Sequence, residues 1–422
     1  MAPPHNFVAS QPRAVQYHST ASPSRAQTVQ PRSNPGSRRA PAASASPGPT
    51  MGAVQDARAA SVPRPPRTAE EPQRYGPGVV VEIAEHRFRC RDILGRGSYS
   101  EVWRADVLAG GAGLSEVALK EVRCGSQAEL QQAIFEVQVV LALERSAEPG
   151  TVLRVPRCIA YKVEPCRQGG WKVRTALTVV PGDALDHVIR RPAPPGQTVA
   201  AAMRLGCALS VKLMLDIGPM LQALAPIAWH RDVNSHNILV DGIPADAAPE
   251  EVVQRASFWL IDFGLAVDAQ SWVTDHGKWR TEYIGGDSRY WPPSSWMMHL
   301  LGPEGFEGRA DLCEQYQWRL DVHGLGITAV ELLCTVLGAA PAAAQEAASM
   351  TARGLLLDSW RRYQENVWRW WSAVFQVFST GGDIAPVQAQ LVQERIIDQL
   401  EELLANIRLA LRSCAAQEEP SI

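Results

Sequence analysis

The sequence of 422 residues contains no long uninterrupted hydrophobic run, and its first residues include no apolar segment of the kind found in secretory signals. Its most apolar stretch, residues 324–344, is interrupted by Glu331 and Pro341, so we expect no membrane-spanning helix. A net charge of only -3 argues against nucleic acid or an anionic membrane as the main partner. The 46% hydrophobic and 20% charged content predicts a soluble globular protein with a sizeable core.

Paired cysteines are absent as well. None of the eight cysteines forms the C-x-x-C spacing that is common in zinc sites and redox motifs. We therefore expect neither a zinc site nor a disulfide framework, and interpret the cysteines as reduced thiols in a cytoplasmic compartment. The eight residues are Cys90, Cys124, Cys158, Cys166, Cys207, Cys313, Cys334 and Cys414.

The first 77 residues have few large aliphatic side chains and no hydrophobic periodicity. They are rich in Pro, Ser, Ala and Arg, and such a segment buries too little apolar surface to offset its ordering entropy, so we predict a disordered tail over residues 1–77. Residues 1–75 carry nine Arg, no Lys and three acids, a net +6. This composition is similar to that of an organelle transit peptide, but the many prolines favour a solvated regulatory or spacer tail.

The remainder divides into a strand-rich part and a helix-rich part, which predicts an α+β protein with domains over residues 78–182 and 183–422. Short β-type runs separated by glycines predict strands, and apolar residues at helical spacing predict helices. Strands are predicted at 79–83, 87–90, 101–108, 117–122, 152–163 and 171–180. Helices are predicted at 127–145, 184–190, 200–224, 322–337, 355–378 and 385–411.

The octet from His230 to Asn237 carries the strongest chemical signal. It places a carboxylate, Asp232, five residues before a carboxamide, Asn237, and the apolar run Ile238–Val240 follows at once. Phosphoryl transfer needs a carboxylate that orients the attacking hydroxyl and an oxygen ligand for the metal on the phosphates. An ordinary structural loop is the alternative for this octet considered alone.

A glycine-containing turn lies between two predicted strands at residues 95–102. Gly95 and Gly97 would let backbone N–H groups approach phosphate oxygens with no Cβ in the way. The third glycine of the usual nucleotide loop is replaced by Ser100, and an ordinary hairpin explains the turn equally well.

Lys120 and Asp262 are further candidate site residues because of their positions on predicted strands. Lys120 lies on an apolar strand, where a bare ammonium group is costly unless it is paired. Glu136 on the following predicted helix is the favoured partner, with Glu129 and Glu144 as alternatives. Asp262 ends an apolar strand just before a glycine, a suitable place for a Mg²⁺ ligand, although a plain strand end gives the same pattern.

Taken in order, these pieces resemble the eukaryotic protein kinase family, whose pattern is G-x-G-x-x-x-x-V, V-A-x-K, a helix Glu, H-R-D-x-x-x-x-N and D-F-G. Downstream, Arg289–Ser294 stands where the family ends its activation segment. The stretch Asp321–Gly326 resembles the start of the central helix of the larger lobe. The resemblance covers about residues 85–337 and implies a two-lobed fold, with a small antiparallel β lobe and a larger helical lobe.

The resemblance also implies roles for individual residues. Lys120, held by Glu136, would contact the α- and β-phosphates of ATP. Asp232 would orient the substrate hydroxyl, while Asn237 and Asp262 would bind Mg²⁺. Asp321 would bond the backbone of the catalytic loop. The implied cofactor-binding positions are Gly95, Gly97, Val102, Ala118, Lys120, Glu136, Leu177, Val180, Leu239 and Asp262, with residues 178–180 as the strand that bonds adenine.

Several residues depart from the family pattern. Asn234 replaces the lysine that neutralises charge on the transferred phosphate, so the resemblance predicts a higher rate for Asn234→Lys unless His236 or another cation serves. Asp287 replaces a threonine, and would either raise the pKa of Asp232 or need a partner such as Arg289. Ser294 replaces a glutamate. Residues 241–257 and 295–318 are longer than usual and are predicted insertions.

The resemblance also bears on regulation, whereas the C-terminal part is interpreted from its own residue pattern. Arg231 beside Asp232 implies a switch by phosphorylation of the activation segment, with Thr274, Thr281 or Ser271 as acceptors. The last predicted helix has an apolar face, which we assign to packing, with a partner-binding helix as the alternative. Packing is also preferred to a ligand cage for four tryptophans, Trp360, Trp368, Trp370 and Trp371.

The sequence therefore favours a divergent protein kinase that uses ATP and Mg²⁺ to phosphorylate Ser or Thr of a protein substrate. Serine/threonine specificity rests on the absence of a tyrosine-kinase Arg signature. The alternative is a pseudokinase that binds ATP and acts as a scaffold, with the tail or the last helix as a regulatory contact. A small-molecule phosphotransferase is disfavoured by Arg231 and Asp321.

Overall fold

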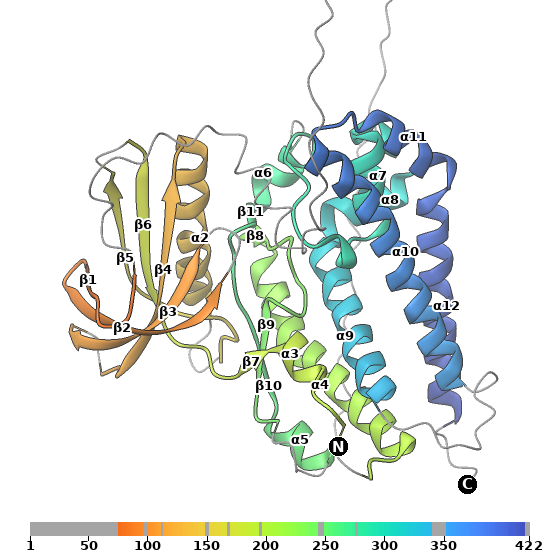
Figure 1. Ribbon diagram of the computed structural model, residues 1–422, viewed down its shortest axis with the longest axis horizontal. Helices are drawn as coiled ribbons and strands as arrows, with labels where there is room; N and C mark the ends of the chain where they lie inside the picture. Colours follow the sequence, from red (N-terminus) through yellow and green to blue (C-terminus); the bar gives the residue numbers. More distant parts are fainter. Residues whose placement is uncertain are drawn as a thin grey trace, which may run out of the picture. The chain divides into compact units, whose positions relative to one another are not determined.

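The computed structural model describes residues 75–96, 100–110, 113–147, 152–166, 169–193, 196–243, 249–274, 277–339 and 352–417. The predicted tail lies outside these residues except for 75–77, and so does Gly97. The described residues form a mixed protein in which an antiparallel sheet precedes a mainly helical part (Figure 1).

The N-terminal part is a six-stranded sheet with one helix. Its spatial order is β1-β2-β3-β4-β6-β5, and every neighbouring pair is antiparallel. The strands are β1 (Val80–Ile83), β2 (His86–Arg96), β3 (Glu101–Ala109), β4 (Glu116–Cys124), β5 (Cys158–Pro165) and β6 (Trp171–Leu177). Side chains alternate in burial along β2, where Phe88 and Cys90 are buried between exposed neighbours, because successive residues point to opposite faces.

Helix α2 (Gln127–Ser146) packs against this sheet (Figure 1). It starts at Ser126, whose hydroxyl accepts the N–H of Glu129 and so satisfies one of the unpaired donors of the first turn. Its apolar side chains Leu130 and Ala133 pack with Cys124 and Val173 of the sheet. This packing fixes the rotation of the helix, and with it the direction of Glu136.

The C-terminal part contains the remaining elements. Its helices are α3 (Leu185–Ile189), α4 (Val199–Leu224), α5 (Pro249–Arg255), α6 (Ala269–Val273), α7 (Pro293–Leu301), α8 (Ala310–Trp318), α9 (Leu320–Ala339), α10 (Ala352–Thr380), α11 (Ala385–Gln393) and α12 (Ile396–Gln417). Single 3-10 turns are η1 (Lys278–Arg280), η2 (Ser288–Tyr290) and η3 (Pro303–Phe306). Short strands are β7 (Asp183–Ala184), β8 (Ala228–Trp229), β9 (Ile238–Asp241), β10 (Ser257–Leu260) and β11 (Val267–Asp268).

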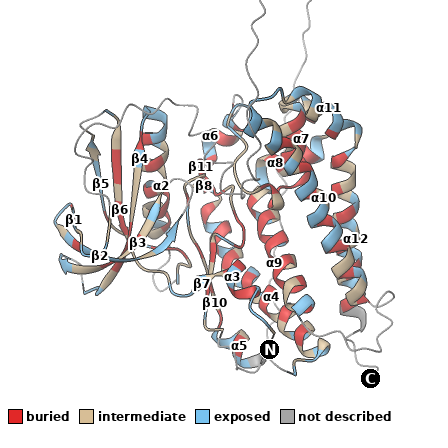
Figure 2. Ribbon diagram, viewed as in Figure 1, coloured by how far each residue is buried: buried red, intermediate tan, exposed pale blue. Residues whose placement is uncertain are grey.

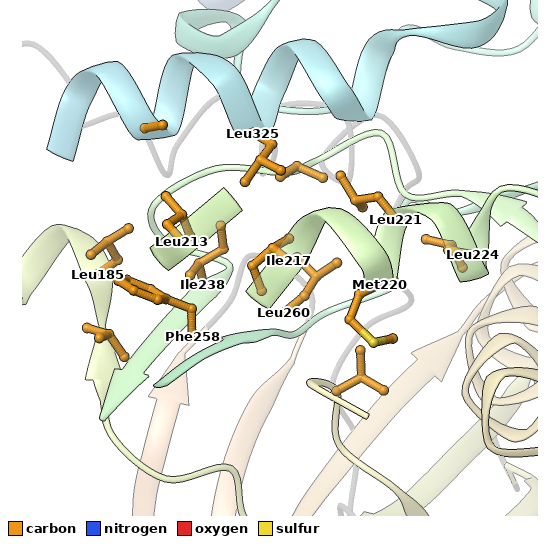
Figure 3. Close-up of a cluster of buried hydrophobic side chains, with 14 of the residues drawn as sticks. Leu185, Leu213, Ile217, Met220, Leu221, Leu224, Ile238, Phe258, Leu260 and Leu325 are labelled. Carbon is orange, nitrogen blue, oxygen red and sulfur yellow. The ribbon is translucent and has the colours of Figure 1, made fainter. Parts of the chain in front are cut away.

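The main core of this part lies between α4, α9 and the strands β9 and β10. Figure 3 shows its apolar side chains meeting from these elements, among them Leu213, Ile217, Ile238, Phe258 and Leu325. Ile238 and Phe258 are fully buried, so the strands that flank the octet and precede Asp262 are anchored in the core. Figure 2 shows buried residues along α4 and α9. Because protein interiors are closely packed, this core positions the polar ends of both segments.

Helix α9 is the one helix in the described part of the chain that is long and apolar enough to cross a membrane. Its central residues are buried against α4, where the Ser210 hydroxyl donates to the Ala329 carbonyl at 2.9 Å. The apolar composition of α9 is therefore that of a core helix.

Several predicted boundaries are wrong, and the strand predicted at 87–90 runs from His86 to Arg96. The strand predicted at 152–163 starts later, at Cys158, and ends at Pro165. The strand predicted at 171–180 ends at Leu177, so residues 178–180 are not a strand. The helix predicted at 385–411 is two helices, α11 and α12. Arg395 separates them with a φ of 55°, a left-handed conformation that stops a helix.

The predicted insertions contain helices. Helix α5 lies within the first insertion, and α7, η3 and α8 occupy most of the second. The apolar face of α12 packs as expected, since Leu400 and Ile407 are buried in a cluster that also holds Trp360 and Trp370. Trp371 packs against the same cluster, whereas Trp368 is half exposed.

Candidate functional site

The octet predicted to carry chemistry forms a loop between β8 and β9, and Asp321 of α9 holds this loop in place. Both carboxylate oxygens of Asp321 accept backbone N–H groups, from His230 and from Arg231, each at 2.7 Å. Arg231 has a φ of 66°, an unfavourable conformation for a residue with a side chain. The two hydrogen bonds that Asp321 accepts offset that strain, and they confirm the contact predicted for Asp321.

The buried ring of His230 also supports the loop. Its Nε2 lies 3.2 Å from the carbonyl oxygen of Ile261, and its Nδ1 accepts the N–H of Asp232 at 3.3 Å. The ring is neutral in this arrangement, since Nδ1 must carry a lone pair. Burial lowers the pKa of His230, in agreement with the neutral form.

Asp232 is the centre of the loop's hydrogen bonds. Its Oδ1 accepts the amide of Asn234 at 2.8 Å and the N–H of Asp287 at 3.0 Å. Its Oδ2 accepts the amide of Asn237 at 2.8 Å. The spacing of five residues predicted from the sequence thus brings Asp232 and Asn237 into direct contact.

The ionisation of Asp232 reflects its surroundings. Burial and then the charge of Asp287 raise the pKa of Asp232 to about 7, although the N–H of Asp287 and the amide of Asn237 favour the charged form. A carboxyl group with such a pKa changes its charge near neutral pH, as a general base is expected to do.

Asn234 is buried and serves the loop as a brace. Its amide nitrogen donates to the carbonyl and the carboxylate of Asp232, while its Oδ1 accepts the N–H groups of His236 and Asn237 at 2.9 and 3.1 Å. The residue that departs from the kinase pattern therefore has a clear structural role, which the sequence did not indicate.

Lys120 joins the sheet to the segment that follows β10. Its Nζ lies 2.5 Å from the carboxylate of Glu136 and 2.9 Å from that of Asp262. Burial opposes the charge of Lys120, but the two carboxylates outweigh that effect and raise its pKa. Lys120 in turn lowers the pKa of Asp262, which keeps that side chain ionised.

The structure distinguishes between the three glutamates considered for Lys120. Glu136 pairs with it, whereas Glu129 accepts the N–H of Gly125 at 2.7 Å and Glu144 pairs with Arg157 at 2.8 Å. Of these three side chains, only Glu136 therefore reaches the site, from the packed face of α2.

Gln132 was missed by the sequence analysis. Its side-chain amide donates to the carbonyls of Gly264 and Ala266 at 3.0 and 2.8 Å, so α2 is tied directly to the chain beyond Asp262. Gln132 lies one helical turn before Glu136, on the same side of α2. That spacing is the signal that would have found it.

The residues predicted to surround adenine are placed on several elements. Val102 pairs with Lys120 across β3 and β4, and Ala118 pairs with Leu177 across β4 and β6. Val180 follows β6, and Leu239 lies on β9. Gly95 lies on β2 opposite Val102.

The connection between the two parts is held close to β9 by Gly182. This glycine has a φ of 93°, and a Cβ there would overlap the backbone of Val240 and approach Asp241 N to 2.7 Å. Only glycine fits such a contact. The chain segment with Val180 is thereby held next to the strand that carries Leu239.

Asp287 approaches the octet as predicted, and it also has the predicted partner. Arg289 donates to both carboxylate oxygens of Asp287, from Nε at 3.1 and 2.9 Å and from Nη2 at 2.5 Å. The preceding Gly286 has a φ of 86°, and a Cβ there would overlap the carbonyl of Arg231. This close approach lets the N–H of Asp287 reach Asp232.

Arg231, expected to bind a phosphorylated residue, already has partners. Its guanidinium donates to the carbonyl of Tyr283 and lies 5.2 Å from the ring centre of Trp272, which is fully buried. The predicted acceptors are Ser271 in α6, Thr274 just after it, and Thr281 just after η1.

No protein-family model matches this sequence, and no curated protein matches it. Among solved structures, the chain is similar to the kinase domain of BubR1, with 17% sequence identity and a TM-score of 0.40, over 86% of this chain and 98% of that chain.

Proposed function

We propose that the protein is an ATP-dependent protein kinase that transfers the γ-phosphoryl group to Ser or Thr hydroxyls of a protein substrate. The observation that carries the proposal is the contact of Lys120 with Glu136 and Asp262, beside a loop in which Asp232 and Asn237 touch. These five side chains come from both parts of the chain, and phosphoryl transfer depends mainly on positioned charges of these kinds.

In this proposal ATP, with bound Mg²⁺, supplies the phosphoryl group, and the protein supplies position and charge. Lys120 binds phosphate oxygens, and Glu136 holds Lys120 in place because the two are only 2.5 Å apart. Asp232 accepts the hydrogen bond of the substrate hydroxyl and directs it at the phosphorus. Val102, Ala118, Leu177, Val180 and Leu239 are the proposed adenine contacts.

The residues present fit a Mg²⁺ ion. Asn237 uses its amide nitrogen on Asp232, which leaves its carbonyl oxygen as the acceptor. Asp262 commits Oδ1 to Lys120 and Gly264, and its side chain is 47% exposed. One amide oxygen and one carboxylate oxygen, completed by water and phosphate oxygens, suit magnesium. Among the described residues there is no group of three or more His, Cys, Asp or Glu that would hold a metal by itself.

A second candidate function is an ATP-binding pseudokinase that acts as a scaffold. It is favoured by the hydrogen bonds on Asp232, whose two oxygens already accept from Asn234, Asn237 and Asp287. The lack of a lysine at position 234 points the same way, because that position then contributes no charge to the transferred phosphate.

Phosphoryl transfer to a generic basic protein from radiolabelled ATP separates the two candidates. We expect the wild type to transfer label, and Asp232→Asn to bind Mg-ATP without transferring it. Binding is measured as a rise in melting temperature on adding Mg-ATP. A wild type that shows this rise but transfers no more label than Asp232→Asn would support the scaffold.

A further inference from the structure

The catalytic loop, residues 230–237, is connected to α3 through a series of side chains that have no role in the proposed function. Arg289 Nη2 lies 2.7 Å from His236 Nε2, and His236 Nδ1 lies 3.1 Å from Asp186 Oδ2. Asp186 belongs to α3 and is buried. Arg289 also binds Asp287, through Nε and Nη2, and the N–H of Asp287 donates to Asp232.

The chemistry of these groups fixes the direction of each hydrogen bond. A guanidinium group can only donate, so Nε2 of His236 accepts from Arg289. The proton of the neutral ring is then on Nδ1, which donates to the carboxylate of Asp186. His236 therefore holds Arg289 by accepting its hydrogen bond, and it contributes no positive charge of its own.

The chain of contacts joins three segments that are distant in the sequence. Asp186 also donates its backbone N–H to the carbonyl of Ser235 at 3.1 Å, so α3 holds the catalytic loop by backbone and by side chain. Tyr363 of α10 donates to the carbonyl of Arg289 at 3.1 Å. Arg289 is thus fixed at its backbone carbonyl and, through Nε and Nη2, at its guanidinium group.

We propose that Arg289 is a positioning residue for Asp232, held by the His236–Asp186 pair so that it keeps the backbone N–H of Asp287 on the Asp232 carboxylate. This inference rests on the proposed kinase function and deepens it. A partly buried Asp287 without Arg289 would carry an uncompensated charge beside Asp232, and its loop would lose the ion pair that orients it. Arg289 acts through Asp287 and does not touch the reacting atoms.

Four variants test the proposal, with transfer kinetics as the first measurement. Arg289→Gln removes the clamp on Asp287, and His236→Leu removes both bonds of the ring. We expect kcat to fall roughly tenfold to a hundredfold in each, the range that a displaced reacting group costs, with KM for ATP unchanged. His236→Gln still accepts from Arg289 and donates to Asp186, so it should keep the wild-type kcat. Arg361→Gln, an exposed arginine of α10 paired with Asp358, is the matched control.

Hydrogen exchange at the Asp287 amide is the second measurement, and it does not require activity. We expect faster exchange of this amide in Arg289→Gln and in His236→Leu, but not in His236→Gln or Arg361→Gln. If Arg289→Gln fails to fold, the half-exposed His236 still provides the comparison of Leu with Gln.

Wild-type kcat and unchanged exchange in Arg289→Gln and His236→Leu would overturn the proposal. An equal loss in His236→Gln and His236→Leu would also overturn it, because the acceptor role of the ring would then be irrelevant. If the wild type transfers no phosphate, the proposed function fails, and the exchange of the Asp287 amide alone decides whether Arg289 positions the loop.

Discussion

At the residue scale, the ionisation of Asp232 depends on the acid beside it. The pKa of Asp232 is raised to about 7 by burial and by Asp287, so the carboxyl group is protonated below that pH and charged above it. Because the proposed role needs the charged form, the transfer rate should rise with pH through about 7.

Asp287→Asn is expected to move this rise to lower pH. The substitution removes a neighbouring negative charge and keeps the shape of the side chain. Its remaining oxygen still accepts from Arg289, so the backbone N–H at position 287 is expected to stay on Asp232. The measurement is the rate of single-turnover transfer against pH for the wild type and the variant. An unchanged midpoint would show that Asp287 does not influence the ionisation of Asp232.

Asn234 leads to a prediction opposite to the one made from the kinase pattern. The pattern predicts that Asn234→Lys raises the rate, but the side chain is 3% exposed and makes four hydrogen bonds in the loop. A lysine would leave the N–H groups of His236 and Asn237 without their acceptor. We expect Asn234→Lys to lower the free energy of unfolding by about 1–3 kcal/mol and to lower the rate. Thermal unfolding and transfer assays check this, and a faster variant would restore the original interpretation.

At the scale of the elements, α2 is connected to the site by more than its ion pair. The two bonds from Gln132 hold the chain after Asp262 against the helix. Gln132→Leu removes both, at about 1 kcal/mol for each bond, and should lower the rate of transfer. Gln131→Leu is the matched control, because Gln131 is the exposed neighbour on the same helix. Equal rates for the two variants would remove Gln132 from the account.

The segment between Asp262 and α7 is held in place by apolar packing. Trp272 is fully buried and Trp279 nearly so, and Arg231 contacts Trp272 and the carbonyl of Tyr283. The order of this segment therefore does not require a phosphorylated residue bound to Arg231. Phosphatase treatment and the variants Thr274→Ala and Thr281→Ala should leave the transfer rate unchanged. A large loss of rate in either variant would show that phosphorylation of this segment does control transfer.

At the scale of the whole described chain, local patterns predicted most elements but not their long-range contacts. The helix at 127–145 and the strand with Lys120 follow from the periodicity of their apolar residues, which depends on neighbours in the sequence. The break at Arg395 has no Gly or Pro to mark it, and it was missed. Strand ends such as Leu177 depend on the partner strand, which local propensity does not include.

The same distinction holds for the site. Asp232, Asn237, Lys120 and Asp262 were found because the motif fixes their spacing. Asp186 was not found, since nothing near it in the sequence marks a residue that binds His236, 50 positions later, through tertiary packing. Contacts of this kind are made by the fold, and they determine how the motif residues are held.

The central claim is that the Asp232 carboxylate supports transfer of the γ-phosphoryl group to a protein hydroxyl. The most direct measurement is phosphoamino-acid analysis of a protein substrate after incubation with labelled Mg-ATP, for the wild type and for Asp232→Asn. We predict labelled phosphoserine or phosphothreonine with the wild type and none with Asp232→Asn, although both bind Mg-ATP. Equal labelling by the two proteins, or none by either, would contradict the account.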